Sequence, residues 1–555
     1  MECLSNLDEK SQEKASLKIV EMNKNNNYTD KYLDFITFAQ DFALVPSIND
    51  YNYYNTKSIT ITPSKIIYNI PDPIITNHFQ RKLNKYNENI IKVHIVDEDY
   101  KNFSFYDINS SQRLALFIRS IFSNGINLGF CKYNYIGSSN HQLKSLGGWM
   151  INLEGIRILN DDKDNEINSI LLKDKINYKK KFYSLQLFIN CEEIINIFGD
   201  FSKEDNIFKN TSRKGMIFSD TKYIKNISID NVKTLKDEIN GKYIITDGIG
   251  KISKNLIELT AKDWGIKDIN NNPISAIQIR FMGCKGVLAV DPFLENDSIY
   301  IRESQIKFNT DDTSLNVCSI SNYKEASLNR QFIILLSSLG VKDEIFIAIQ
   351  TNITKKYYTI FKNPNIALNY DNSVYNEFKN KISQFGPILD KFWKNNINLF
   401  NEPLFSQLLD VFAYSKLMKI KRTGKLNDKK CVCLMGVIDE THSLEQDEVY
   451  IHIINNSENQ KIDIILEQKV IVYRSPSLYP GDIKILKAKK NFFLKHMVNV
   501  IVFSKKGKRP TFNKLSGGDL DGDRYFISFN EDIINNIIDI NCKALEDLNI
   551  LKKIF

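Results

Sequence analysis

Three aspartates, Asp519, Asp521 and Asp523, stand at alternate positions in the segment KLSGGDLDGDRYFIS. Unit charges about 4 Å apart repel by roughly 1 kcal/mol per pair even in water, and by more when they are partly buried. On a regular strand, alternate side chains face one side, and Gly522 would let the backbone tighten so that the three carboxylates converge. Because carboxylate oxygens suit hard divalent cations, the spacing predicts a metal site.

Calcium and magnesium are the two ions to compare. A D-x-D-x-D run also opens a calcium-binding EF-hand loop, which needs glycine at its sixth position and glutamate at its twelfth. Counted from Asp519, these positions hold Arg524 and Asn530. An exposed acidic turn is a further alternative, but the apolar run RYFISF that follows is typical of a buried strand. Magnesium, which binds few carboxylates and completes its shell with water and substrate phosphates, matches better.

A strongly basic segment leads directly to the aspartates. Between Asp482 and Gly518 the local charge balance is +9, with one acid and ten cations, at positions 484, 487, 489, 490, 495, 505, 506, 508, 509 and 514. A charge run is usually a solvated face. Beside a carboxylate cluster, however, these cations predict a surface for a polyphosphate or a nucleic-acid backbone, and the pair of features is typical of phosphoryl transfer.

The elements that position these residues follow from hydrophobic patterning. Short β-branched runs punctuated by glycine predict β-rich domains over residues 205–319 and 421–530. Between them, residues 320–420 predict a helical connector, because apolar residues recur at helical spacing: Leu404, Phe405, Leu408, Leu409 and Phe412. Residues 1–30 are interpreted as a polar tail, 31–204 as a mixed α/β region and 531–555 as a C-terminal helix.

Bulk properties exclude few functions. The net charge of +8 is small for 555 residues, and the 43% hydrophobic and 25% charged contents are ordinary for a globular protein. The eight cysteines are scattered, which favours buried thiols in a reducing compartment over disulfides or a zinc ribbon. The absence of an apolar leader and of a long apolar run predicts an intracellular protein, cytoplasmic or nuclear, without a membrane partner. Aromatic residues show no alternation with basic ones, so no stacking platform is predicted.

Five segments in order resemble the cellular RNA-dependent RNA polymerases of RNA silencing. The segment FSKKGKRPTFNKLSGGDLDGDRYFIS resembles the family's KGxRP and SGxDLDGDxYF motifs, and YRSPSLYPGDIKILKA resembles RNPxLHPGD. LMGVIDETHSLEQDEVYIHI is similar to MGxxDETGxLxxGxVF. Upstream, TDGIGKIS and QIRFMGCKGVLAVDP are similar to SDGIG and QxRxxGxKGVxxVDP. The resemblance covers about residues 210–530.

The resemblance implies an α+β fold in which two double-psi β-barrels, joined by the helical connector, face each other across the active site. It implies that Asp519, Asp521 and Asp523 hold the catalytic Mg²⁺, with a second ion arriving on the nucleoside triphosphate. Residues that would bind this nucleotide are Arg280, Lys285 and Lys307 at the triphosphate and Arg474 near the ribose.

The implied activity is template-directed nucleotidyl transfer that copies single-stranded RNA and makes double-stranded RNA for silencing. A single-chain polymerase of the same double-barrel type that copies DNA, and a non-catalytic nucleic-acid-binding scaffold, are the alternatives. Two departures from the family pattern stand out. Lys514 replaces an acidic residue before the loop, and 32 residues follow Asp523 where the family continues into a helical region. We therefore expect either a compact or truncated polymerase, or a partner chain that completes the template channel.

Overall fold

The computed structural model describes residues 51–103, 108–129, 131–153, 190–266, 268, 272–362, 378, 402–457 and 460–537. The predicted tail over 1–30 lies outside these residues, as does most of the predicted helix over 531–555, of which α16 (Glu531–Ile534) is described. The chain forms two compact units. Unit 1 runs to Asn226 and adds Arg280–Cys284 and Lys307–Cys318; unit 2 comprises Ile227–Ile279, Lys285–Ile306 and the chain from Ser319 onward.

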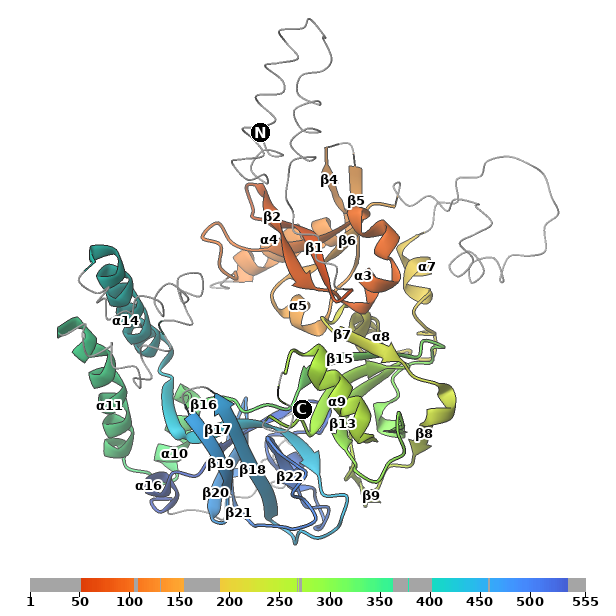
Figure 1. Cartoon of the computed structure of the whole chain (residues 1–555). Helices are drawn as coiled ribbons and strands as arrows, with labels where there is room; N and C mark the ends of the chain where they lie inside the picture. The colour runs from red at the N-terminus through yellow and green to blue at the C-terminus, as the bar shows by residue number, and fades with distance from the viewer. Residues whose placement is uncertain are drawn as a thin grey trace, which may run out of the picture. The chain divides into compact units, whose positions relative to one another are not determined.

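A six-stranded mixed sheet forms the centre of unit 1, in the order β2-β1-β3-β6-β5-β4 (Figure 1). Its strands are β1 (Tyr53–Ile61), β2 (Ile66–Ile75), β3 (Ile90–Ile95), β4 (Ile126–Leu128), β5 (Cys131–Gly137) and β6 (Gly147–Ile151). The helices of unit 1 are α3 (His78–Lys82), α4 (Ile108–Asn124), α5 (Asn140–Lys144), α7 (Cys191–Asn196) and α8 (Ile207–Lys214). The predicted mixed α/β character of this region is therefore observed.

Both faces of this sheet are buried, which explains the short apolar runs in its strands. Along β6, Trp149 and Ile151 enter one apolar cluster, with Phe198 and Phe218. Met150, between them, enters the opposite cluster, to which α4 contributes Ile121. Alternate strand residues point to opposite faces, so a strand covered on both sides is apolar throughout.

The first predicted β-rich region forms an open row of strands. Within a seven-stranded sheet the order β12-β13-β11-β14-β8 is observed, with β8 (Val232–Leu235), β11 (Ile249–Ile252), β12 (Ala276–Phe281), β13 (Cys284–Val290) and β14 (Ile299–Arg302). Strand β11 pairs in parallel with β13 and antiparallel with β14. Helix α9 (Lys254–Asp263) and a short hairpin of β9 (Ile239–Asn240) and β10 (Tyr243–Ile244) accompany these strands. In unit 1, β7 (Lys222–Asn226) pairs with β15 (Ser314–Ile320).

The second β-rich region of unit 2 closes into a ring. Successive pairings run β17-β22-β18-β21-β20-β23, and β23 returns to β17. The strands are β17 (Leu426–Ile438), β18 (Glu448–Ser457), β20 (Lys469–Arg474), β21 (Lys484–Ala488), β22 (Val500–Phe503) and β23 (Arg524–Ser528). Two further strands lie outside the ring, β16 (Glu325–Leu328) paired with β17 and β19 (Gln460–Ile465) paired with β18. A predicted barrel is thus observed as a closed ring, whereas its predicted partner is the open row described above.

Helix α10 (Arg330–Ser338) packs against this ring through aromatic contacts. The ring of Phe332 stacks on that of Tyr473 in β20 with centroids 3.8 Å apart, and it meets Phe526 of β23 edge-on at 5.1 Å. The neighbouring Tyr525 contacts Phe503 of β22 instead. Alternation along β23 therefore sends Phe526 toward the helix and Tyr525 toward the loop that precedes the strand.

The predicted apolar stripe lies on helix α14 (Pro403–Thr423), as expected. Leu409 and Phe412 are buried and pack with Tyr357 of α11 (Asp343–Lys362), which explains the spacing of the stripe. Proline at the first helical position and Gly424 in the left-handed conformation after the last turn are ordinary start and stop residues of a helix. Among the residues that the structure describes, no helix is both long and apolar enough to span a membrane.

Candidate active site

The aspartate loop connects the short helix α15 (Thr511–Lys514) to β23 in unit 2. Strand β23 begins at Arg524, so the expectation that the aspartates lie on a regular strand is wrong. The backbone bends instead: Gly522 has φ 127°, which only glycine adopts readily, and the predicted tightening at this residue is confirmed. Leu520 between the aspartates is fully buried and anchors the loop.

Backbone hydrogen bonds hold the loop from several directions. The Leu520 N–H donates to the Asp247 carbonyl at 3.1 Å, and the Gly436 N–H donates to the Asp523 carbonyl at 3.1 Å. The Tyr525 hydroxyl donates to the Asp519 carbonyl at 2.8 Å. The loop is therefore a fixed structure and not an exposed acidic turn.

The three carboxylates converge closely enough to share a cation. One oxygen from each of Asp519, Asp521 and Asp523 lies within 4.8 Å of the others, so this group could bind a metal ion. Burial, together with the charges of the other two aspartates, raises the pKa of Asp519 to about 7. The loop thus holds more negative charge than its protein surroundings neutralise, and hard oxygen donors of this kind fit a divalent cation.

Lys285 is the first of two cations observed at the loop. Its ammonium, on β13, lies 2.6 Å from the Asp521 carboxylate, and both side chains are partly exposed. The positive charge of Lys285 also opposes the rise in the Asp519 pKa. One residue predicted to bind the triphosphate is therefore placed directly beside the predicted metal ligands.

Arg474, at the end of β20, is the second cation. Its guanidinium contacts both Asp523 oxygens, through Nε and, at 3.3 Å, through Nη2. Nη1 donates to the Ser516 carbonyl at 3.1 Å. Burial alone would lower the pKa of Arg474, but the hydrogen bond and charge of Asp523 outweigh it and the pKa is raised. The structure therefore shows Arg474 orienting the loop; its predicted contact with a nucleotide ribose stays a prediction.

Gly248, which precedes β11, and Gln278 of β12 lie against the loop, and neither was identified from the sequence as a site residue. Gly248 has φ +80°, and a Cβ there would lie 2.7 Å from the Asp521 Cβ. Gln278 of β12 donates from Nε2 to the Asp521 carbonyl at 3.0 Å. Both residues belong to the family-like segments TDGIG and QIRFMGCKG, so the resemblance contained the signal. Their role is visible only once the segments are folded together.

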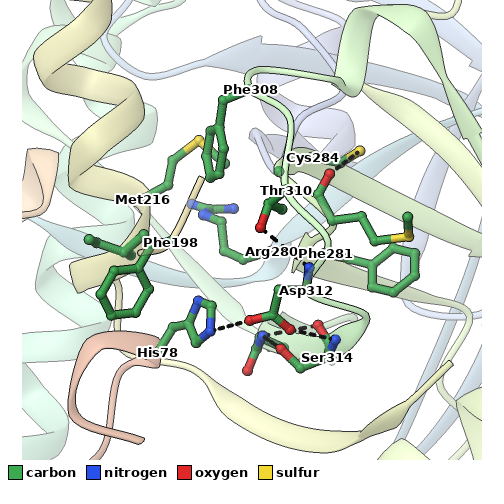
Figure 2. Close-up of a pocket in the computed structure, with 14 residues that line it drawn as sticks. His78, Phe198, Met216, Arg280, Phe281, Cys284, Phe308, Thr310, Asp312 and Ser314 are labelled. Carbon is green, nitrogen blue, oxygen red and sulfur yellow. Dashed lines mark hydrogen bonds and ion pairs between the residues drawn. The ribbon is translucent and has the colours of Figure 1, made fainter. Parts of the chain in front are cut away.

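Arg280 and Lys307 belong to unit 1, whereas the aspartates belong to unit 2. Arg280 lines a cavity of about 30 Å³ with His78, Phe308 and Asp312 (Figure 2). The Asp312 carboxylate lies 2.6 Å from His78, and although burial opposes it, this contact holds the pKa of Asp312 well below its usual range. The predicted triphosphate contacts of Arg280 and Lys307 stay predictions.

Cys284, in the same GCKG segment, is a buried free thiol, as expected. Burial raises its pKa to about 12, and the charge of Lys307 only partly offsets that effect. A thiol in this state is neutral and unreactive near pH 7. The neighbouring lysine therefore does not turn Cys284 into a nucleophile.

One cation of the predicted basic surface is buried and forms ion pairs inside the protein. The Lys505 side chain is 3% exposed, and its ammonium contacts Glu238 and, at 2.8 Å, Glu440. Arg302 of β14, also 3% exposed, donates to the same Glu440 at 3.0 Å. Lys505 is thus not a surface cation, and the interpretation of the whole run as a phosphate-binding face is too broad. The lysines at 487, 489, 490 and 495 are exposed.

Comparisons with known proteins show a family and several relatives. The family model described as "RNA dependent RNA polymerase" matches residues 61–546. The chain is 28% identical to RNA-dependent RNA polymerase 1 of Arabidopsis thaliana over 91% of this chain and 43% of the relative. It is 29% identical to the probable RNA-dependent RNA polymerase 1 of Oryza sativa subsp. japonica, over 85% of this chain and 59% of the relative. It is 26% identical to RNA-dependent RNA polymerase 1 of Schizosaccharomyces pombe, over 96% of this chain and 42% of the relative.

A solved structure shows a similar fold. The RNA dependent RNA polymerase QDE-1 from Thielavia terrestris superposes with a TM-score of 0.70 at 17% identity, over 97% of this chain and 59% of that one. The chain thus spans about two fifths to three fifths of the length of these proteins. Because the family model covers well over half of the sequence, the chain belongs to the RNA dependent RNA polymerase family.

Proposed function

We propose that this chain is an RNA-dependent RNA polymerase that copies single-stranded RNA by nucleotidyl transfer and releases pyrophosphate. Family membership and the names of the relatives support this activity. The product would be double-stranded RNA, and the proposed cellular use is RNA silencing. The closed ring and the open strand row of unit 2 are compatible with the proposed pair of double-psi barrels.

One observation carries the proposal: three carboxylates converge within 4.8 Å, with a lysine ammonium 2.6 Å from one of them. Phosphoryl transfer depends mainly on positioning and on charge stabilisation, so it needs anions that hold metal ions beside cations that hold phosphates. The aspartate loop and Lys285 supply both kinds of group at one place.

Magnesium is the proposed ion, held by Asp519, Asp521 and Asp523. The donor set fits it, because the ligands are few and all are carboxylates, which leaves room for water and phosphate oxygens. When bound, magnesium supplies charge that favours the deprotonated RNA 3′ hydroxyl and neutralises the reacting phosphate. A second Mg²⁺ would arrive on the nucleoside triphosphate.

The protein's own cations orient the reactants. Lys285 can exchange its contact with Asp521 for phosphate oxygens, because an ammonium on a flexible stem binds either partner. Arg474 keeps Asp523 in place through two nitrogens. Arg280 and Lys307 are proposed to neutralise the triphosphate.

Nucleotide incorporation on matched templates tests the proposal. Purified protein receives magnesium, the four ribonucleoside triphosphates and single-stranded RNA or DNA of the same sequence. We expect complementary RNA from the RNA template, and loss of the product when one required nucleotide is omitted. Product from DNA alone would support the DNA-copying alternative. Absence of product from a folded protein that still binds RNA would support the non-catalytic scaffold.

A further inference from the structure

Two adjacent phenylalanines, Phe492 and Phe493, lie outside the core in the loop between β21 and β22. Their exposed fractions are 73% and 66%. Their rings meet edge-on, with centroids 6.1 Å apart and an interplanar angle of 84°. Single exposed apolar residues are normal on protein surfaces, so the exposure alone indicates nothing. The anchoring of the loop and the charges around the two rings indicate what the pair can bind.

The loop that carries the pair is firmly anchored. Leu494 and Met497 are buried, and the Met497 N–H donates to the Leu494 carbonyl at 2.8 Å. Asn491 accepts from the Phe493 N–H at 2.9 Å and donates to the Ser443 hydroxyl at 2.7 Å. The loop therefore presents both rings to the outside at fixed positions while its own apolar residues fill the core beneath.

The segment that carries the pair is basic. Residues 484–496 contain five lysines and no acidic residue. The ammonium of Lys495 lies 4.5 Å from the centroid of the Phe492 ring, so a cation covers one face of that ring. Lys489 and Lys490 have acidic partners at 3.3 and 3.8 Å, Glu448 and Glu467. The Lys490–Glu467 pair is exposed on both sides, and exposed ion pairs are weak and exchange readily with other anions.

We propose that Phe492, Phe493 and the surrounding lysines form a binding site for single-stranded RNA, outside the catalytic loop. Bases stack on aromatic rings whatever their sequence, while lysines attract the phosphates, and the combination is how proteins bind single strands without sequence preference. Bases of a duplex stack on one another and cannot reach the rings. The choice of RNA as ligand rests on the proposed polymerase function.

Equilibrium binding of a fluorescent, unstructured oligoribonucleotide tests the site. The chelator EDTA is present and nucleotides are omitted, so that binding is measured without catalysis. We expect Phe492→Ala combined with Phe493→Ala to weaken binding about fivefold or more, as the loss of one stacked base does. Phe492→Trp should retain wild-type binding, whereas Phe492→Leu should weaken it, because leucine keeps apolar area but has no π face. The double alanine substitution should weaken the binding of double-stranded RNA less than the binding of single-stranded RNA.

Phe293→Ala is the matched control. Phe293 is 95% exposed, but its segment DPFLEND contains three acidic residues and no lysine or arginine. We expect this variant to bind single-stranded RNA like the wild type. Equal unfolding midpoints of all variants would show that the substitutions leave the fold intact.

Two outcomes would overturn the site: unchanged RNA binding in the double alanine variant, or full retention by Phe492→Leu. Reduced self-association of the double alanine variant with unchanged RNA binding would identify a protein-docking surface instead. The Asp521→Asn variant separates this inference from the proposed function, since it should bind the oligoribonucleotide as the wild type does. An inactive wild type whose binding still falls in the double variant would refute the polymerase and keep the RNA site.

Discussion

At the scale of single residues, the site depends on compensated charge. Three aspartates within 4.8 Å would repel one another strongly, and Lys285 and Arg474 each neutralise one of them. The pKa of the third, Asp519, is raised to about 7 by burial and by the charges of the other two aspartates. The two cations are not equivalent, because Arg474 also donates to the loop backbone, whereas Lys285 contacts the Asp521 side chain.

Lys285→Ala is therefore expected to weaken nucleotide use more than stability. Hydrogen bonds to charged groups contribute about 1.5–3 kcal/mol, so the KM for nucleoside triphosphate should rise roughly 10-fold or more. Steady-state incorporation at varied nucleotide concentration measures this. The control is Lys254→Ala, which removes a lysine that is 71% exposed and pairs with Glu258 one helical turn away. An unchanged KM in Lys285→Ala would remove the assigned role.

Gly248 offers a test of how tightly the loop is positioned. An added Cβ would come within 2.9 Å of the Asp521 backbone nitrogen, so Gly248→Ala should displace the loop. Misplacement of a reacting group by about 1 Å can cost roughly 100-fold in rate, and we expect an effect of that order on incorporation. Both the nucleotide incorporation rate and the free energy of unfolding are measured for this variant and for the wild type.

Gly241→Ala is the control for backbone strain. Gly241 also has positive φ, +59°, but a Cβ there meets nothing within 4 Å. This variant should lose about 1–2 kcal/mol of stability, the usual cost of the left-handed conformation, and keep its incorporation rate. Equal rates for the two alanine variants would mean that contact with Gly248 does not position Asp521.

At the scale of elements, buried ion pairs join the open strand row to the closed ring within unit 2. Glu440, which follows β17, contacts Arg302 of β14, Lys505 after β22 and, at 3.7 Å, Lys251 of β11. The Asp521 contacts of Lys285 and Gln278 also connect these two sets of strands. The geometry of the aspartate loop therefore depends on an interface whose charges must stay paired.

Glu440→Gln should lower the free energy of unfolding by about 3–5 kcal/mol at pH 7, because it leaves buried cations without their shared anion. Burial opposes ionisation of Glu440, but the charges of Arg302 and Lys505 outweigh it, and the net pKa is lowered. A carboxyl whose pKa is lowered by folding stabilises the fold at every pH above its pKa in the unfolded chain, which is about 4.3. This contribution is lost as the pH falls through the pKa of the folded state.

Denaturant unfolding between pH 7 and pH 3 measures this dependence. The difference between the wild type and Glu440→Gln should stay constant from pH 7 to about pH 5 and shrink below about pH 4.3. The exposed Glu258→Gln is the control and should change little at any pH. A difference that grows as pH falls would contradict the sign of the Glu440 shift.

At the scale of the whole molecule, the sequence predicts the parts of the site that are local. Alternating aspartates, Gly522 and the strand after them are contiguous, and their spacing was enough to predict that the three carboxylates converge. Resemblance added Lys285, some 230 residues away, whose contact with Asp521 is observed. Hydrophobic spacing also predicted α14 correctly.

What the sequence could not predict depends on tertiary packing. Lys505 stands in a basic run like any surface lysine, and only the fold shows that Glu238 and Glu440 bury it. Gln278 and Gly248 are uncharged, so nothing in their types pointed to the loop. Phe492 and Phe493 are adjacent and not alternating with lysines, and their outward presentation comes from the anchors Leu494 and Met497.

The most direct test of the central claim is single-nucleotide incorporation on a single-stranded RNA template by the wild type and by Asp521→Asn. Asparagine keeps the size of the side chain but removes the charge that contacts Lys285 and that is proposed to hold the metal ion. Asp447→Asn is the control, since Asp447 is largely exposed and lies 3.5 Å from the Lys514 ammonium. We predict template-matched incorporation by the wild type and by Asp447→Asn, and none detectable by a folded Asp521→Asn. Incorporation by Asp521→Asn at the wild-type rate would contradict the account.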